Sequence, residues 1–505
     1  MASKNLIVPR TLKGCLDLLP EEAIARNQII DRIRKVYESY GYAPLDTPVL
    51  EYIDTLLGTG GEETNKELFR LESPEGDAIA LRFDLTVPFA RLLAQYPEQI
   101  KPPVRRYHIG PVFRGDKPDP GRYRQFTQCD IDVAGSASPA MDAEVIAVMC
   151  DVMKAIGITQ YRILINNRKL IDALLDDCGI HDPAVQKHAL RVVDKLGKVG
   201  IENIIKELGG GRIDDSGDPI RGVGLAPATI DKLIAFISLK APTRAGMLAA
   251  WEERLAPSVQ SDGSVRPVGQ VGLVGQVEQA GPCSSAAAAI AEMRELADAL
   301  DGLGIPEENA VFDPSLARGL DYYTGPVFEN TLPQAPEFGS IGGGGRYDGL
   351  VSRFLPQPIP ATGFSVGLDR LIAALRHLGA LETRRGVADV IVVTMRGVAP
   401  KEYLRLASEI RAGGLACEVY FGRKKDGVSQ QLSYANDKGI PVAVIVGGDE
   451  LAAGTVSIKD LNEGREAREG IADNEAYRAA GKAGQQTILR ADMVARIRQI
   501  LSNGA

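Results

Sequence analysis

Apolar and polar residues alternate with a period of two along residues 124–134, which is typical of a β-strand, and residues 106–114 form a second run that favours a strand. The residues between the runs include Pro118, Pro120 and Gly121, which favour a turn. The pattern therefore predicts an antiparallel hairpin.

The second strand of this hairpin has one apolar face and one polar face. The polar face carries these side chains: Arg124, Phe126, Gln128, Asp130 and Asp132. Three arginines converge near the turn, because Arg114 closes the first strand while Arg122 and Arg124 open the second. A guanidinium group is well shaped to bind phosphate with two hydrogen bonds. We interpret this surface as a site that clamps phosphates, stacks a base and holds a small polar substrate. The alternative is the solvated face of a surface hairpin.

Other parts of the first half also follow regular patterns. Apolar residues recur at helical spacing over residues 21–40 and predict an amphipathic helix. The extended segment that follows contains Pro48, which predicts either an edge strand or a strand broken at an interface. A strand-to-helix junction within 78–96 carries Asp84 and Thr86. Side chains at such a junction either cap the helix or project into a cleft, and the pattern leaves both readings open.

The remaining elements predict several further regions. A helix is expected over 140–156 and a strand over 161–165. Residues 169–308 combine helical patches with glycine-rich joints, which predicts an inserted, largely helical subdomain. After a polar linker near 381–389, strands and helices alternate, and this predicts a small, mostly parallel sheet with helices on its faces. Within it, residues 455–461 are expected to form a β-hairpin.

Composition narrows the class of protein only slightly. With 505 residues, 45% hydrophobic and 25% charged, the sequence is typical of a globular protein of several domains. Its net charge of −8 argues against coating nucleic acid through bulk charge. The six cysteines form no CxxC pair, which suggests neither a zinc site nor a disulfide framework. No apolar segment indicates secretion or membrane spanning, so a cytoplasmic location is expected. We interpret the four histidines as ordinary structural or surface residues: His108, His181, His188 and His377.

Three motifs carry a resemblance to a known family. The stretch GPVFRGDKPDPGRYRQFTQCDIDVAG at 110–135 resembles motif 2 of class II aminoacyl-tRNA synthetases, and its GRYRQFTQ core resembles that of histidyl-tRNA synthetases. RGLDYY at 318–323 resembles the histidine-specific signature of that family, and ATGFSVGLDRLIAAL at 361–375 resembles motif 3. The N-terminal helix and proline-containing strand resemble motif 1, which builds the dimer interface in that class. Apart from the insertion, the resemblance covers the chain from about residue 10 to its end.

The resemblance implies an α+β catalytic domain with a central antiparallel β-sheet, a helical insertion and a C-terminal α/β anticodon-binding domain. It divides the catalytic domain into 1–168, with motifs 1 and 2, and 309–384, with the signature and motif 3. The insertion is expected over 169–308 and the anticodon-binding domain over 385–505.

The resemblance also implies roles at the ATP end of a site. Arg114 would contact the α-phosphate, while Arg122 and Arg370 would hold the β- and γ-phosphates. Asp116 would meet the adenine amino group and Phe126 would stack on the ring. Arginine suits this site because a carboxylate must attack a phosphate, and both groups are anions.

At the amino-acid end, the implied substrate is L-histidine. Arg318 is expected to bind the substrate carboxylate and the α-phosphate in the transition state, which makes it, with Arg114, a catalytic residue. An imidazole needs one acceptor and one donor, and the family's pattern assigns these to Asp132, Tyr322 and Tyr323. The α-amino group is assigned to the remaining residues: Asp84, Thr86 and Gln128.

The implied reaction activates L-histidine with ATP to histidyl-adenylate and pyrophosphate, then transfers histidine to the 3′ end of histidine tRNA. Mg²⁺ is expected with ATP, no protein metal cluster is expected, and a homodimer without membrane contact is expected. One alternative is a catalytically silent paralogue, such as the regulatory subunit that partners ATP phosphoribosyltransferase. Such paralogues typically lack the C-terminal domain and the signature arginine and tyrosines, which this sequence retains. A simple RNA-binding module would leave the convergent arginines and carboxylates unexplained.

Overall fold

The computed structural model describes residues 7–57, 67–214, 217–255, 282–317, 322–422, 426–466 and 484–503. The chain divides into two compact units. The first consists of Met1–Asp17 and Ile29–Leu381, and the second of Leu18–Gln28 and Glu382–Ala505. Among the described residues, no helix is long and apolar enough to cross a membrane.

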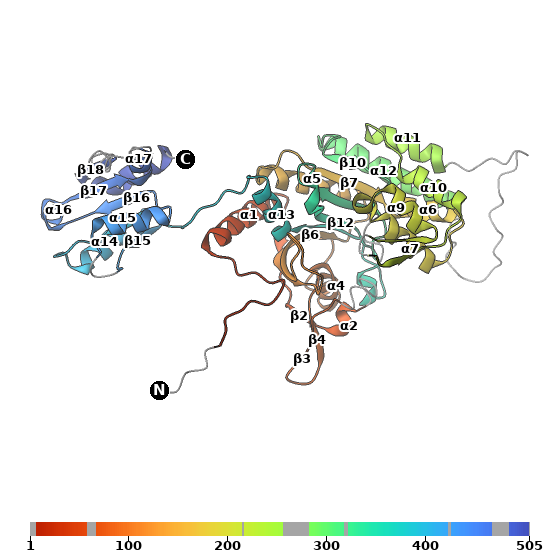
Figure 1. Cartoon of the computed structure of the whole chain (residues 1–505), viewed down its shortest axis with the longest axis horizontal. Helices are drawn as coiled ribbons and strands as arrows, with labels where there is room; N and C mark the ends of the chain where they lie inside the picture. Colours follow the sequence, from red (N-terminus) through yellow and green to blue (C-terminus); the bar gives the residue numbers. More distant parts are fainter. Residues whose placement is uncertain are drawn as a thin grey trace, which may run out of the picture. The chain divides into compact units, whose positions relative to one another are not determined.

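The first unit is built on a large sheet, to which the described residues contribute eight strands (Figure 1). In spatial order they are β1 (Ala43–Pro44), β5 (Val104–Phe113), β6 (Gln125–Ala134), β13 (Ala361–Gly367), β12 (Ser340–Arg346), β11 (Pro326–Thr331), β7 (Arg162–Asn167) and β10 (Ala310–Phe312). Neighbours from β5 to β7 run antiparallel. The outermost pairs, β1 with β5 and β7 with β10, are parallel. The expected antiparallel sheet is therefore confirmed at the centre and is mixed at its edges.

The predicted hairpin forms the second and third strands of this sheet, β5 and β6. β5 and β6 pair along their whole length, from Val104 opposite Ala134 to Phe113 opposite Gln125. The extended segment that contains Pro48 is broken into two short strands, because β1 pairs at the outer side of β5 and β2 (Leu50–Tyr52) pairs with β4 (Ala78–Leu81) in a separate sheet. Pro48 lies between the two strands, so the broken strand is the alternative that forms.

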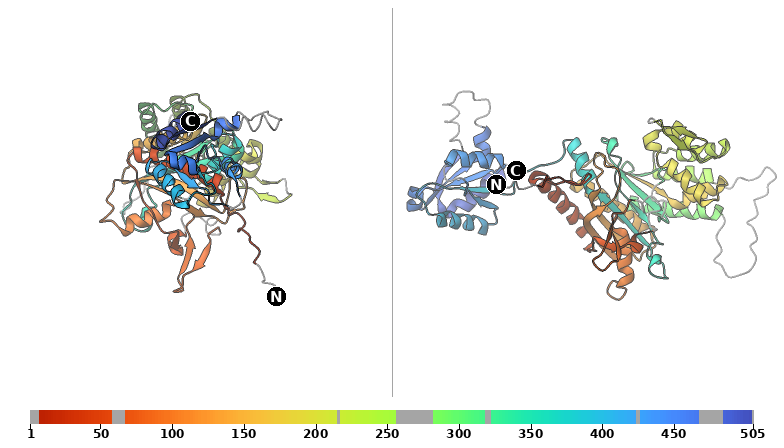
Figure 2. Two further views of the ribbon diagram at one scale, coloured as in Figure 1. Left: turned by 90° about the vertical axis from the view of Figure 1, so that its left-hand side faces the viewer. Right: turned by 60° about the horizontal axis from the view of Figure 1, so that its bottom comes forward.

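Helices cover one face of the sheet, as two further views show (Figure 2). They are α1 (Pro20–Ser39), α5 (Pro139–Ala155), α6 (Arg168–Asp177), α12 (Pro282–Gly302) and α13 (Leu368–His377). The apolar face of β6, with Cys129, Ile131 and Val133, is buried in the same core as side chains of these helices. α5 begins where it does because the Ser138 hydroxyl accepts a hydrogen bond from the Ala140 amide and Pro139 fits the first turn.

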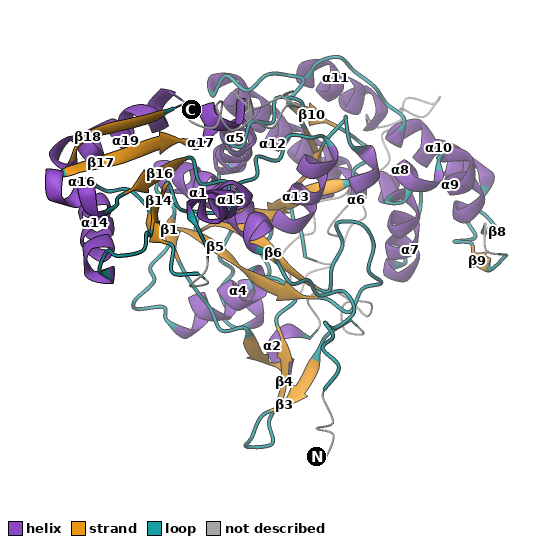
Figure 3. Ribbon diagram, turned by 60° about the vertical axis from the view of Figure 1, so that its left-hand side comes forward, coloured by secondary structure: helices purple, strands orange, loops and turns teal. Residues whose placement is uncertain are grey.

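The other face of the sheet carries the polar side of β6. A small sheet and two short helices lie on this side: β2 (Leu50–Tyr52), β4 (Ala78–Leu81), β3 (Arg70–Glu72), α2 (Ile53–Leu56) and α4 (Thr86–Gln95). Figure 3 shows α4 and α13 on opposite sides of β5 and β6. A second apolar core, which includes Phe89 and Leu93 of α4, fixes this layer beside the sheet. The polar face of β6 is therefore left to line a cavity.

Between β7 and β10 the described chain is largely helical, as predicted. Beyond α6 it forms α7 (Pro183–Val193), α8 (Leu196–Val199), α9 (Ile201–Leu208), β8 (Gly211–Ile213), β9 (Pro219–Arg221), α10 (Pro227–Ile237) and α11 (Arg244–Leu255). Trp251 of α11 is fully buried and stacks on Phe312 of β10, with ring centroids 5.5 Å apart. This contact ties the helical segment to the edge of the sheet.

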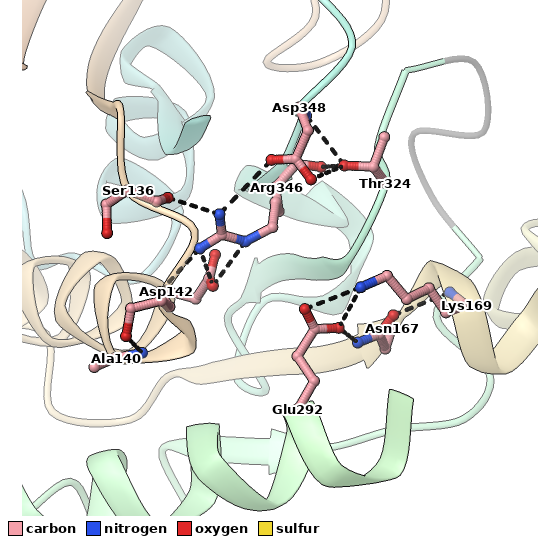
Figure 4. A network of polar contacts seen from close by, with 10 residues as sticks. Ser136, Ala140, Asp142, Asn167, Lys169, Glu292, Thr324, Arg346 and Asp348 are labelled. Carbon is pink, nitrogen blue, oxygen red and sulfur yellow. Dashed lines mark hydrogen bonds and ion pairs between the residues drawn. The ribbon is translucent and has the colours of Figure 1, made fainter. Parts of the chain in front are cut away.

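Buried ionic contacts link β12 to the helical layer (Figure 4). Arg346 of β12 pairs with Asp142 of α5 at 2.6 Å, and its guanidinium also donates to the Ser136 and Ser138 carbonyls. Because Arg346 precedes Tyr347, this anchor also fixes the end of the strand that delivers Tyr347 to the cavity. A second cluster joins Glu292 of α12 to Asn167 and Lys169.

The second unit is a smaller sheet in the order β15 (Cys417–Val419), β14 (Val390–Val393), β16 (Val442–Ile445), β17 (Thr455–Asp460) and β18 (Gln485–Leu489). Its helices are α14 (Pro400–Ala412), α15 (Val428–Asp437), α16 (Gly448–Ala453), α17 (Leu461–Glu466) and α19 (Met493–Asn503). The α/β class is as predicted, but two details were wrong. Residues 455–460 form a single strand rather than a hairpin, and β17 pairs antiparallel with both neighbours, so the sheet is only half parallel. The β17 partner comes from a later segment, which local periodicity does not reveal.

Candidate active site

A cavity of about 880 Å³ opens on the polar face of the central sheet. The residues predicted for the site come from four parts of the chain: β6, the β5–β6 loop, the segment between β4 and α4, and the residues around β11 and α13. Those that line the cavity are Asp84, Thr86, Arg114, Asp116, Arg122, Phe126, Gln128, Asp132, Tyr322, Tyr323 and Arg370. Arg318 lies outside the described residues. The fold thus brings together predicted residues that are as far apart as Asp84 and Arg370.

Arginines gather at one end of the cavity. The Arg114 guanidinium lies over the Phe126 ring at 5.2 Å and donates from Nε to the Phe83 carbonyl at 3.0 Å. Arg370 Nη1 donates to the Ser340 carbonyl at 2.7 Å. A partly exposed aromatic ring beside guanidinium groups suits a ligand that has both a flat base and phosphates.

Two carboxyl groups accompany Arg122 at this end. Arg122 Nη2 pairs with Asp116 Oδ2 at 2.5 Å. Burial acts to raise the pKa of Asp116, but hydrogen bonds from Glu67 and Arg122 hold it below its usual range. Burial and the hydrogen bond to Asp116 raise the pKa of Glu67 to about 7. Glu67 therefore holds a proton that Asp116 has given up, and Asp116 remains an anion.

Three further carboxyl groups line the cavity: Asp84, which interacts with Arg114, and Asp130 and Asp132 on β6. Burial raises the pKa of Asp84 and of Asp132 to about 6 and that of Asp130 to about 7. Arg106, which is 1% exposed, lies beneath them and pairs with Asp132 Oδ2 at 2.5 Å. The Tyr347 hydroxyl donates to Asp132 Oδ1. Asp132 is therefore held in one orientation by two groups that enter from different strands.

Two further features shape this part of the cavity. The Tyr322 hydroxyl donates to the Tyr323 hydroxyl at 3.2 Å, so the two predicted tyrosines form one polar pair. Gly363 on β13 faces Asp132 across the sheet, and a Cβ at this glycine would come within 2.1 Å of Asp132 Oδ1. Glycine is therefore needed at this position to make room for the carboxylate.

The sequence left open whether Asp84 caps the following helix or projects into a cleft. Its Oδ1 accepts a hydrogen bond from the Val87 amide at 3.1 Å, in the first turn of α4. The same side chain lines the cavity. Capping and facing the cleft are therefore both true of this residue.

Sequence reasoning missed several residues of the cavity. Asp130 was placed on the polar face of β6 but was given no role, although the period-two pattern already put it between Gln128 and Asp132. Glu67 and Tyr347, which line the cavity, and Arg106, which pairs with Asp132 of the cavity wall, gave no local signal. Side chains of α7 and the turn after it also reach the wall: Lys187, His188, Arg191, Asp194 and Lys195. His188, expected to be an ordinary structural or surface residue, thus lies at the cavity.

Replacing Asp130 with asparagine is expected to stabilise the ligand-free protein, and the gain should grow with pH. An unfolded aspartate ionises near pH 4, whereas Asp130 in the folded protein keeps its proton up to a pKa of about 7. Between these values each pH unit lowers the stability of the parent by about 1.4 kcal/mol, so the advantage should level off above pH 7 at no more than about 4 kcal/mol. Urea unfolding of both proteins across this range measures the difference. A difference that is independent of pH would contradict the expectation.

Comparisons with known proteins agree with this geometry. A family model described as histidyl-tRNA synthetase matches residues 14–213 and 220–371, and one described as an anticodon binding domain matches residues 389–477. The histidine–tRNA ligase of Caulobacter vibrioides is 41% identical over 506 residues, which covers 97% of this chain and 96% of that protein. That of Paracoccus denitrificans is 39% identical over 97% of both chains. A crystal structure of histidyl-tRNA synthetase from a Nostoc species has a TM-score of 0.77 at 29% identity and covers 98% of this chain and all of that one.

The mixed sheet, the cavity on its polar face and the separate C-terminal α/β unit define the fold of a class II aminoacyl-tRNA synthetase. Within that class, the chain belongs to the histidyl-tRNA synthetase family. It is an ATP-dependent aminoacyl-tRNA ligase that charges histidine tRNA.

Proposed function

We propose that the cavity carries out both steps of histidine ligation. In the first, the carboxylate of L-histidine attacks the α-phosphate of ATP, which gives histidyl-adenylate and releases pyrophosphate. In the second, a hydroxyl at the 3′ end of histidine tRNA attacks the histidyl carbonyl of the adenylate, the ester to tRNA forms, and AMP leaves. The supporting observation is that arginines and buried carboxyl groups line one cavity, so an anionic and a cationic substrate part are accommodated together.

At the arginine end, Arg114 contacts the α-phosphate, and Arg122 and Arg370 hold the β- and γ-phosphates. Phe126 stacks on adenine, whose amino group meets Asp116. Fixed guanidinium groups stabilise the charge that develops on the α-phosphate without having to reorganise. Arg318, in the RGLDYY signature, completes this set through the substrate carboxylate and the α-phosphate.

In the part of the cavity that takes histidine, Asp132, Tyr322 and Tyr323 bind the imidazole. Asp84, Thr86 and Gln128 bind the α-amino group. A wrong amino acid would lack the imidazole N–H that Asp132 accepts beside its bonds to Arg106 and Tyr347, so the pocket discriminates by binding alone.

Pyrophosphate exchange with each of the twenty amino acids, without tRNA, tests this function. Exchange with histidine alone is expected. A folded protein that binds histidine without exchange would instead indicate the regulatory paralogue that partners ATP phosphoribosyltransferase. Exchange with several amino acids would contradict the assignment of Asp132 and the tyrosines to the imidazole.

Mg²⁺ accompanies ATP in this proposal. Among the described residues no group of three or more His, Cys, Asp or Glu side chains could hold a metal ion. Mg²⁺ commonly binds through substrate phosphates and water, with few protein ligands. The ion would therefore enter with the nucleotide and offset its negative charge.

The domain division proposed for this chain keeps the boundaries expected from the sequence. The catalytic domain comprises 1–168 and 309–384, the insertion 169–308, and the anticodon-binding domain 385–505. A cytoplasmic location completes the proposal, since the tRNA substrate and the unpaired cysteine pattern both suit that compartment.

The active form is expected to be a homodimer. β1 is an outer strand of the described sheet, and Leu50 and Tyr52 on β2 are 46% and 59% exposed. An edge strand beside exposed apolar side chains suits an interface between two copies. Sedimentation equilibrium at micromolar concentration should give twice the chain mass. A monomer at that concentration would refute the expectation.

A further inference from the structure

Asp130 occupies the middle of the cavity floor. It lies on β6 between Gln128 and Asp132, directly opposite His108 of β5 and Ser365 of β13. Its side chain is 2% exposed, and it lines the cavity. A carboxyl group so deeply buried in the centre of a sheet is rare unless something binds it.

Part of this carboxyl group lacks a partner. Among the described residues, Asp130 Oδ1 and Gln128 Oε1 are buried acceptors to which no donor is bound. The rest of both side chains is fixed, because Gln128 Nε2 donates to Ser365 Oγ at 2.6 Å and Ser365 hydrogen-bonds to Asp130. Two oriented acceptors with no donor imply that a ligand supplies one.

The charge of the surroundings narrows the chemistry of that ligand. Asp84, Asp130 and Asp132 are all buried in this part of the cavity, and Arg106 already pairs with Asp132. Burial, with Arg106 and Arg82 nearby, lowers the pKa of His108 to about 3, so its ring is neutral and adds no positive charge. The cations around these carboxyl groups are already engaged, because Arg106 pairs with Asp132, Arg82 donates to the Thr47 and Pro111 carbonyls, and Arg114 donates to the Phe83 carbonyl. A positively charged donor would therefore be favoured over a neutral one.

The position of Asp130 along β6 indicates which group of the substrate it would bind. Alternate residues of a strand lie nearly 7 Å apart, so Phe126, Gln128, Asp130 and Asp132 form a row that leads away from the phosphate arginines. In histidine the α-amino group lies between the reacting carboxylate and the imidazole. If Phe126 contacts adenine and Asp132 contacts the imidazole, Asp130 lies between them on β6 and would be next to the α-amino group.

We propose that Asp130 Oδ1, together with Gln128 Oε1, binds the α-ammonium group of histidine and supplies its main counter-charge. This assignment rests on the proposed function of the cavity and adds to it a carboxylate for the ammonium group. The three N–H donors of the ammonium group match the two unpartnered oxygens and the nearby Asp84 carboxylate. Ser365 acts as a positioning residue, since it holds both Gln128 and Asp130.

Binding of three ligands to the full-length protein separates the parts of the substrate. Histidine carries the ammonium, carboxylate and imidazole groups, histamine lacks the carboxylate, and 3-(imidazol-4-yl)propionate lacks the ammonium. Asp130→Asn keeps the shape of the side chain and removes its charge. It should lower the affinity for histidine and for histamine by about 10- to 100-fold, the range for the loss of a hydrogen bond to a charged group. It should change the affinity for imidazolylpropionate by less than about threefold, which is the usual size of the effect of a surface substitution.

Two further variants keep the test decisive. Tyr323→Phe should lower the affinity for all three ligands by a similar factor, because all three contain the imidazole to which Tyr323 is assigned. Ser365→Ala should weaken binding of the same two ligands as Asp130→Asn, but by a smaller factor. Because this variant retains the Asp130 carboxylate, it tests the assignment even if Asp130→Asn does not fold. ATP affinity and urea unfolding of each variant report any general damage to the site.

The outcomes distinguish this assignment from the function on which it rests. Equal losses for all three ligands in Asp130→Asn would mean that Asp130 faces the imidazole or only shapes the pocket, and would overturn the assignment. Unchanged affinity for histidine would overturn it as well. A folded parent protein that binds none of the three ligands would overturn the proposed function itself.

Discussion

Replacing Arg114 with alanine is expected to lower histidine-dependent pyrophosphate exchange by a factor on the order of 10³, with the fold intact. Arg114 is half-buried, its Nε is anchored on the Phe83 carbonyl, and its guanidinium lies over Phe126. This leaves its other nitrogens directed at the place assigned to the α-phosphate. The loss corresponds to about 4 kcal/mol of transition-state stabilisation.

The effect should appear in kcat more than in KM for histidine, because negative charge on the α-phosphate grows in the transition state. Arg114→Lys should recover only part of the rate, since an ammonium group cannot form two parallel hydrogen bonds. Arg105→Ala is a matched control. Arg105 lies on β5, which ends directly before Arg114, but it pairs with Glu144 of α5 and does not line the cavity. Equal losses in the Arg114 and Arg105 variants would show that the effect is structural.

The central hairpin could be predicted because its information is local. A period of two in the side chains identifies the second strand, Pro118 to Gly121 identify the turn, and the alternation assigns Gln128 and Asp132 to one face. Sequence motifs added Arg370 and the two tyrosines, which the fold then brought to the same cavity. Where residues are neighbours in a strand or belong to one motif, the sequence is sufficient.

The parts that could not be predicted depend on contacts between distant segments. Tyr347 donates to Asp132 across 215 residues, and neither residue carries a local sign of the other. Arg106 alternates like any strand residue, and its role follows only from its burial beneath Asp132. The antiparallel pairing of β17 with β18 has the same cause, since register between separate strands is set by tertiary packing rather than by the strand itself.

The carboxylate of Asp132 leads to the second large expected effect. Asp132→Asn should raise KM for histidine by a factor on the order of 100, while KM for ATP changes by less than about threefold. The asparagine keeps the volume beside Gly363 but replaces an anion by an amide, so an imidazole N–H loses a charged acceptor. Steady-state exchange kinetics with each substrate varied in turn measure both constants. Equal increases in both would undo the assignment of Asp132 to the imidazole.

A double-mutant cycle with Tyr347→Phe tests why Asp132 is effective. In the parent, Tyr347→Phe removes the hydroxyl that orients Asp132 Oδ1 and should raise KM for histidine by about tenfold, the usual size of one lost hydrogen bond in a buried network. If the hydroxyl acts only through the carboxylate, the same change in the Asp132→Asn background should have little further effect. Additive losses would instead mean that Tyr347 contacts histidine directly. The Arg106 pair remains in Tyr347→Phe, so this variant separates orientation of the carboxylate from its charge.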